Sequence, residues 1–139
     1  MKTTLLPYLN FTGTTREAME FYKSIFGGEL TTQTYAEGNP NCAPEDKDLI
    51  MHSELKNDIL TFMAADGNSE HPVHVGDNIS MSLIGSDLEQ LTDWFNKLAE
   101  GGKVDYPLEK APWGDTFGML TDKFGIHWMV NVSAEQPQK

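Results

Sequence analysis

The chain has a single cysteine, Cys42, and no long apolar run. One cysteine excludes an internal disulfide, and its place in the turn-rich stretch NPNCAPED is typical of an ordinary loop residue and not of a nucleophile. No window reaches about 18 apolar residues, and the apolar run in MKTTLLPYLNF is too short for a signal peptide or a membrane span. We therefore expect a soluble cytoplasmic protein.

Basic residues are also scarce. The chain has 10 lysines and arginines against 21 aspartates and glutamates, which gives a formal net charge of −11. This charge repels phosphate backbones and anionic membrane surfaces, so neither nucleic acid nor a membrane is expected as a partner. With 139 residues, of which 39% are hydrophobic and 10% aromatic, the chain suits one folded domain.

Two helix patterns share a start signal, a length and a stop signal. The first begins with a capping box, TTRE at 14–17, and ends at the glycine pair 27–28. The second begins with SDLE at 86–89 and ends at the glycine pair 101–102. The start signals lie 72 residues apart and the stop signals 74, which predicts an internal repeat. Two unrelated amphipathic helices could carry the same signals by chance.

Strand patterns complete the repeat, because each helix has one strand before it and room for three after it. The expected strands of the first half are residues 5–11, 30–35, 49–55 and 59–64, and those of the second half are 78–84, 103–108, 116–120 and 126–132. Each half therefore has the order βαβββ, with a loop at 37–48 inside the first half. Because Pro7 cannot donate to a ladder, the first strand is expected at a sheet edge.

Neither half has enough strands to bury a core alone, so the two are expected to form one cooperative domain over residues 1–139. Its modules are expected at about 1–66 and 78–132, joined by a linker at 67–77 and followed by a polar, mobile tail at 133–139.

The last two strands are the most apolar part of the chain. They flank the polar break DKFG at 122–125, whose glycine can adopt positive φ, and so predict a β-hairpin of central strands. His127, Met129 and Asn131 alternate onto one side of the second strand. We expect a functional site on that side.

The segments PYLNF, REAMEFYKSIFGGEL, MHSEL and LAEGGKVDYPLEKAPWGDTFGMLTDKFGIHWMVN together resemble the PhnB-like branch of the vicinal oxygen chelate superfamily. This branch is also called 3-demethylubiquinone methyltransferase-like, and the superfamily includes glyoxalase I, bleomycin-resistance proteins and extradiol dioxygenases. The resemblance implies an α+β fold in which two βαβββ modules form curved mixed sheets around a cup. It also implies a homodimer, because the superfamily commonly completes or pairs its sheets across subunits.

Members of this superfamily usually hold a divalent metal ion through four side chains. The resemblance places these positions at or near Leu6, Glu54, Asn78 and Met129, and only Glu54 is a strong ligand. Leucine and the methionine thioether do not bind hard divalent ions, so we expect neither a metal nor another cofactor. A shift of one or two residues would bring in His52, which shares a strand face with Glu54, and this leaves metal binding open as the alternative.

Strand alternation and the implied cup predict the ligand-binding residues. They are Tyr8, Asn10, His52, Glu54, Ser80, Trp113, His127 and Met129. His127 and Glu54 are the candidate catalytic residues, although a histidine held by a neighbouring carboxylate or backbone carbonyl would explain His127 slightly better. Trp113 is expected either to cover a bound ligand or to anchor its own loop.

Two further patterns do not predict sites. His71 and His74 lie in SEHPVHVGD, a stretch that could form a weak metal site but is better explained as a solvated loop. No strand is followed by a glycine-rich loop that opens a helix, as an adenosyl cofactor would require, so methyl transfer is not expected.

The sequence predicts a protein that binds a small organic molecule between its modules without metal. The alternative is a metal-dependent lyase, isomerase or dioxygenase of the same superfamily. A scaffold that binds a protein partner is the third possibility, and the absence of a cavity would distinguish it.

Overall fold

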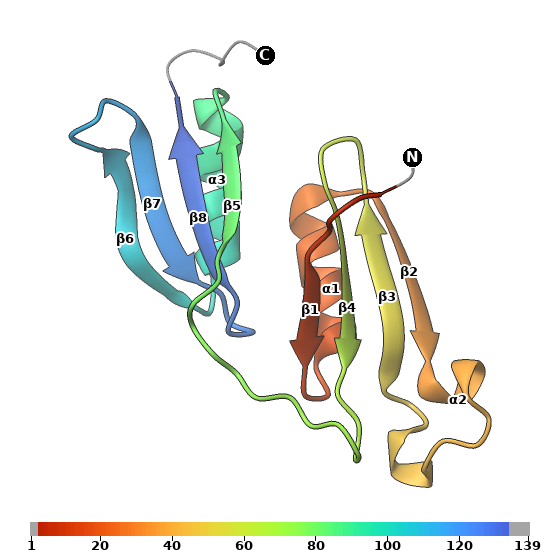
Figure 1. The fold of residues 1–139 in the computed structure, drawn as a ribbon. Coiled ribbons are helices and arrows are strands. Elements are labelled where there is room, and N and C mark those ends of the chain that lie inside the picture. Colours follow the sequence, from red (N-terminus) through yellow and green to blue (C-terminus); the bar gives the residue numbers. More distant parts are fainter. Residues whose placement is uncertain (1–2, 134–139) are drawn as a thin grey trace. The chain divides into compact units, whose positions relative to one another are not determined.

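The computed structural model describes residues 3–133 (Figure 1). The chain divides into two compact units, Met1–Val75 and Gly76–Lys139. Among the helices of the described part, none is long and apolar enough to cross a membrane. The expected tail falls almost entirely on residues 134–139, which lie outside the described residues, and the single cooperative domain stays a prediction.

The first unit is a four-stranded sheet with a helix on one face. Its elements are β1 (Tyr8–Phe11), α1 (Thr15–Phe26), β2 (Glu29–Thr34), α2 (Tyr35–Gly38), the 3-10 helix η1 (Pro44–Asp46), β3 (Ile50–Lys56) and β4 (Thr61–Asp66). The strand order is β1-β4-β3-β2, with β1 parallel to β4 and the other neighbours antiparallel.

The second unit repeats this plan. Its elements are β5 (Met81–Gly85), α3 (Leu88–Ala99), β6 (Lys103–Lys110), β7 (Thr116–Thr121) and β8 (His127–Val132). The order is β5-β8-β7-β6, with β5 parallel to β8, so each strand has the position of its counterpart in the first unit. The internal repeat and the α+β class of two βαβββ modules are therefore confirmed, and β7 and β8 are central strands as expected.

Each helix covers one face of its own sheet because its apolar side chains lie along one stripe. In the first unit Met19 and Tyr22 of α1 are fully buried, and the Tyr22 ring meets Phe62 of β4 edge-on at 5.6 Å. In the second unit Leu98 of α3 is fully buried, as is Val130 of β8. Burial of such side chains on one face stabilises each unit by roughly 1.5 to 3 kcal/mol per residue. Helices α1 and α3 therefore each lie on one face of their own sheet.

The predicted capping boxes at the two helix starts are wrong. Thr14 occupies the N-cap position of α1, but its φ and ψ of −116° and 13° are not the extended conformation of a side-chain cap, and its side chain makes no cap hydrogen bond. The second helix begins one residue later than expected, because the N-cap is Asp87 and not Ser86. The Asp87 carboxylate accepts from the backbone N–H of Gln90 at 3.1 Å.

The glycine pairs end both helices as expected, and the structure shows why each needs two glycines. The first glycine of each pair, Gly27 or Gly101, has a positive φ of 74° or 77°. The second lies against a strand: a Cβ on Gly28 would be 2.5 Å from the Lys56 carbonyl oxygen, and one on Gly102 would collide with the Thr121 carbonyl oxygen. The same approach of helix end to strand thus occurs in both units.

Several boundaries differ from the sequence prediction. The first strand begins at Tyr8 and not at residue 5, directly after Pro7, whose carbonyl accepts from Met63 N–H at 3.1 Å. It lies at a sheet edge, as the proline predicted. The expected loop at 37–48 contains the end of α2 and all of η1. A true capping box starts α2. The Glu37 carboxylate accepts from the backbone N–H of Thr34, and the Thr34 hydroxyl accepts from the backbone N–H of Glu37.

Candidate functional site

The face of the first sheet opposite α1 carries the four predicted site residues of this unit. Tyr8 and Glu54 both pair with Met63, so the three side chains lie in one row across the sheet. Asn10 lies two residues after Tyr8, and His52 two residues before Glu54, on the same face. We call this surface the first open face. The four residues therefore lie on one surface of the sheet.

Tyr8 and His52 are joined across this face. The Tyr8 hydroxyl lies 3.0 Å from His52 Nδ1, and the ring centroids are 5.9 Å apart. Burial raises the pKa of the Tyr8 phenol above its ordinary value, and the nearby Tyr35 adds to the rise. At neutral pH Tyr8 is therefore a neutral hydroxyl that can donate or accept a hydrogen bond.

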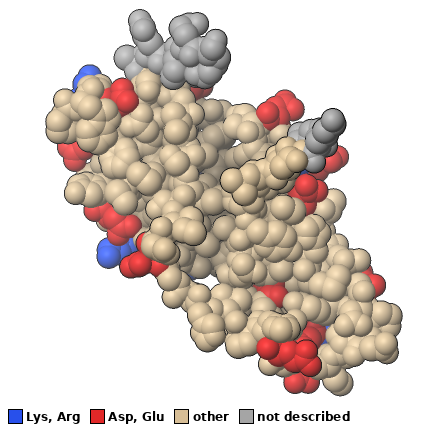
Figure 2. All heavy atoms as spheres, viewed as in Figure 1, with Lys and Arg blue, Asp and Glu red and all other residues tan. Residues whose placement is uncertain are grey.

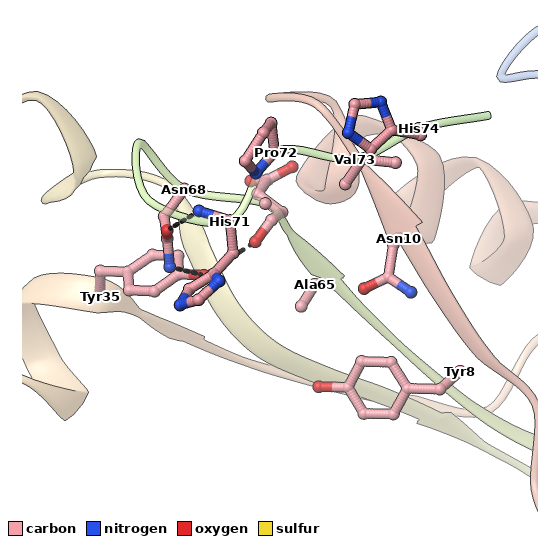
Figure 3. A pocket seen from close by; sticks show the side chains of 11 residues that line it. Tyr8, Asn10, Tyr35, Ala65, Asn68, His71, Pro72, Val73 and His74 are labelled. Carbon is pink, nitrogen blue, oxygen red and sulfur yellow. Dashed lines mark hydrogen bonds between the residues drawn. The ribbon is translucent and has the colours of Figure 1, made fainter.

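A cavity of about 430 Å³ opens at one end of the first open face (Figure 3). It lies between β1 and the segment that follows β4, with Tyr8 and Asn10 on the strand side and Asn68 to His74 on the loop side. The lining residues are Tyr8, Asn10, Tyr35, Ala65, Asp66, Gly67, Asn68, His71, Pro72, Val73 and His74. Its volume falls in the range typical of small-molecule sites.

Hydrogen bonds hold the loop side of this cavity in place. The Asn68 carboxamide accepts from the backbone N–H of His71 at 2.8 Å and donates to the Tyr35 hydroxyl at 3.2 Å. That hydroxyl donates to the Asp66 carbonyl oxygen at 2.8 Å, so the loop is tied to the end of β4 (Figure 3). The arrangement presents imidazole, amide and phenol groups around the alanine at position 65.

Sequence reasoning found only part of this cavity. It named Tyr8 and Asn10, but His52 and Glu54 are not among the lining residues. His71 and His74 are exposed, as expected of a solvated loop, yet both line the cavity. The available signal was the asparagine three residues before His71, since asparagine side chains commonly close such turns.

The second unit places its predicted residues on the face opposite α3, which we call the second open face. Trp128 and Val130 are buried on the α3 side, so His127 and Met129 alternate onto the other side, where they are half-buried. Met129 pairs with Ser82 and with Met119. The remaining predicted residue, Ser80, is exposed and directly precedes β5.

His127 is held by a hydroxyl group and not by a carboxylate or carbonyl. Its Nδ1 lies 3.0 Å from Oγ1 of Thr121, the residue opposite it on β7. Thr121 in turn donates to Asp105 Oδ2 at 2.8 Å. The histidine is thus oriented by a side chain that sequence reasoning did not name.

Trp113 lies in the connection between β6 and β7 and is 62% exposed. Its ring meets that of Phe117 edge-on, with centroids 5.4 Å apart. Phe117 pairs with Asn131, so it lies on the second open face. Trp113 is therefore anchored by an aromatic contact while most of its surface stays available.

The side chains at the metal positions implied by the family resemblance do not fit a divalent ion. Leu6 has no donor atom, Met129 offers a soft thioether, and Asn78 offers a neutral amide, which leaves Glu54 as the one strong ligand. Within each unit, no three histidine, cysteine, aspartate or glutamate side chains of residues 3–133 come together as a metal site.

Charge on the surface is mostly negative. On the face shown in Figure 2 acidic side chains are scattered widely and few basic ones are visible. The cavity of the first unit has no lysine or arginine among its lining residues.

Comparisons with known proteins agree with this architecture. The family model of the Glyoxalase/Bleomycin resistance protein/Dioxygenase superfamily matches residues 4–130 of this chain. Protein PA1353 from Pseudomonas aeruginosa is 37% identical, with a TM-score of 0.86 over 95% of this chain and 98% of that one. The PhnB protein from Bacillus cereus is 26% identical, with a TM-score of 0.76 over 94% and 100%.

A curated relative gives the same result. Protein YjdN from Escherichia coli is 28% identical over 144 residues, which cover 96% of this chain and 97% of YjdN. The structural relatives include a PhnB protein, as the resemblance of the sequence motifs predicted. The chain belongs to the glyoxalase/bleomycin resistance protein/dioxygenase superfamily.

Proposed function

We propose that the protein binds a small organic molecule without a metal ion, at the cavity on the first open face. The cavity itself carries this proposal. It combines a volume of about 430 Å³ with a mostly polar lining, which includes Tyr8 and Asn10, and with the apolar side chains of Ala65, Pro72 and Val73. Such a combination suits a small organic molecule that makes hydrogen bonds as well as apolar contacts.

The charge of the site favours a neutral or positively charged ligand. None of the lining residues is a lysine or arginine, and the chain as a whole carries a formal charge of −11. A carboxylate or phosphate would enter this negative field without a cation to pair with it. We therefore expect anionic analogues of a ligand to bind more weakly than neutral or cationic ones.

The ligand set argues against the alternative, a metal-dependent lyase, isomerase or dioxygenase. Catalytic metal sites normally have three protein ligands and an open position, whereas the implied positions supply one strong ligand, Glu54. Methyl transfer is also not part of the proposal. The glycine pairs follow α1 and α3, whereas an adenosyl site needs a glycine-rich loop between a strand and a helix.

The location and assembly expected from the sequence belong to the same proposal. We propose a cytoplasmic protein, because the sequence has no long apolar run, and a homodimer, as membership of this superfamily suggests. Light scattering at several protein concentrations tests the assembly, with a mass of twice 15.5 kDa expected.

A ligand screen tests the proposed function. Compounds that raise the melting temperature are measured by calorimetry with and without EDTA, on the parent protein and on Asn10→Ala. The matched control is Asn96→Ala, which removes an exposed amide from α3. We expect binding to be unchanged by EDTA and by Asn96→Ala. In Asn10→Ala we expect it to weaken about tenfold, as loss of one hydrogen bond of about 1.4 kcal/mol would cause.

Two results would contradict the proposal. If EDTA abolishes binding, the ligand requires a metal. If added zinc or nickel creates glyoxalase-type turnover that Glu54→Gln removes, the enzyme alternative is correct.

A further inference from the structure

Three polar side chains form a continuous hydrogen-bond chain on the second open face. Asp105 Oδ2 accepts from Thr121 Oγ1 at 2.8 Å, and Thr121 Oγ1 lies 3.0 Å from His127 Nδ1. Nε2 of the half-buried His127 ring has no hydrogen-bond partner among residues 3–133. The series of hydrogen bonds therefore ends on an imidazole nitrogen that has no partner in the described part of the protein.

The chemistry of these groups fixes the direction of both bonds. An ionised carboxylate can only accept, so the single hydroxyl proton of Thr121 is used in the bond to Asp105. Thr121 must then accept from His127, and the His127 Nδ1 atom must carry a proton. A neutral imidazole has one ring proton, so its Nε2 presents a lone pair.

A break in the β6–β7 register places Asp105 within reach. Val104 pairs with Leu120 and Tyr106 with Met119, so Asp105 is the extra residue of a β-bulge. Thr121 pairs with Lys103, whose ammonium group lies 3.6 Å from the other carboxylate oxygen, Oδ1. That contact leaves Oδ2 to accept from Thr121.

We propose that Asp105 and Thr121 are positioning residues that hold neutral His127 in the Nδ1–H tautomer, so that Nε2 accepts a hydrogen bond from an O–H or N–H group of a neutral ligand. The ligand class rests on the proposed function only in that the protein binds a neutral organic molecule, since the site at His127 belongs to the second unit and the cavity to the first. The tautomer needs no ligand, so it is tested separately.

Nitrogen NMR of the four histidine rings measures the tautomer directly. Protein labelled with ¹⁵N is titrated until the imidazoles are neutral, and long-range ¹H–¹⁵N spectra then show which nitrogen of each ring carries the proton. His127→Gln assigns the His127 signals, and exposed His71 and His74 serve as internal references. We expect His127 to be Nδ1–H, with a pyridine-type shift at Nε2.

Variants of Thr121 test whether its hydrogen bonds to Asp105 and His127 fix the tautomer of His127. Thr121→Val keeps the β-branched shape but removes the hydroxyl, so we expect the Nδ1–H tautomer to lose its dominance. Thr121→Ser restores a hydroxyl and should restore the parent spectrum. An Nε2–H tautomer in the parent protein would overturn the proposal, and so would a Thr121→Val spectrum identical to that of the parent.

Phenol and anisole test the ligand class, because they have similar shapes and only phenol donates a hydrogen bond. We expect phenol at millimolar concentration to shift the His127 Nε2 signal at least twice as far as anisole does. Equal shifts, or none, would overturn the assignment of a donor ligand. Such a result would not affect the assignment of the tautomer or the proposed cavity of the first unit, which are tested separately.

Discussion

Thr15 donates two hydrogen bonds to one oxygen of Asp66. Its hydroxyl lies 2.7 Å from Asp66 Oδ1 and its backbone N–H lies 3.1 Å from the same atom. The other oxygen of the carboxylate accepts from the backbone N–H of Ile50 at 2.9 Å. Asp66 therefore joins the start of α1, the start of β3 and the end of β4, beside the proposed binding cavity.

Replacing Thr15 with valine is expected to lower the free energy of unfolding by about 1 to 3 kcal/mol, because the buried carboxylate loses its hydroxyl donor while the side-chain shape is kept. Thr14→Ala is the matched control and should change stability by less than about 0.5 kcal/mol. Urea denaturation midpoints measure both. A larger effect at Thr14 would show that the original capping-box interpretation was correct.

The turn of the last hairpin is expected to depend on Asp122. Its buried carboxylate accepts from Trp128 Nε1 at 2.8 Å and from the backbone N–H groups of Phe124 and Ile126 at 2.9 and 3.0 Å. Asp122→Asn should cost about 1 to 3 kcal/mol, since one acceptor oxygen becomes a donor facing a donor. Chemical denaturation followed by tryptophan fluorescence measures the change. Asp58→Asn removes the same charge from an exposed position, and an equal loss there would contradict the account.

Gly102→Ala is expected to destabilise the second unit by about 1 to 3 kcal/mol, because the added methyl group meets the backbone of Thr121 and Asp122. Gly76→Ala is the control, since the nearest atom to its Cβ would be Asn78 Oδ1 at 3.8 Å. Thermal denaturation measures the two variants side by side. Equal melting temperatures would mean that the contact between the end of α3 and β7 is not tight.

The Tyr8 phenol is expected to ionise above its ordinary pKa of about 10, chiefly because it is partly buried. As pH rises above 10, the unfolded chain then releases this proton first, so the free energy of unfolding falls until folded Tyr8 itself ionises. Absorbance titration of the parent protein minus Tyr8→Phe isolates this group. Tyr106→Phe, which removes an exposed phenol, gives the amplitude of one tyrosine. A difference curve centred at or below pH 10 would contradict the prediction.

The repeat could be predicted from sequence because its glycine pairs have a geometric cause in both units. A second device shared by the units was not recognised. Asn57 Oδ1 accepts from the backbone N–H groups of Ile59 and Leu60 at 2.7 and 2.9 Å, as Asp122 Oδ1 does in the last turn. Asparagine and aspartate differ in charge but fill the same role, so the equivalence is visible only in the hydrogen bonds.

Long-range contacts are the part of the structure that local patterns in the sequence did not predict. Alternation along single strands shows which residues share a sheet face, such as Tyr8 with Asn10 and His127 with Met129, because it depends only on neighbouring residues; their role in a site stays a prediction. Two side chains have partners far along the chain: Tyr8 meets His52, and the Thr15 hydroxyl meets Asp66 and not a helix N–H. No local pattern specifies such pairs.

Backbone NMR with a compound from the ligand screen tests most directly whether the first open face binds an organic molecule without metal. Spectra of ¹⁵N-labelled protein are recorded during titration with the compound, in EDTA and then with zinc in excess over the chelator. We expect saturable shifts in EDTA at residues 8–10 and 65–74, unchanged by zinc. Shifts that appear only with zinc, or that leave both segments unaffected, would contradict the account.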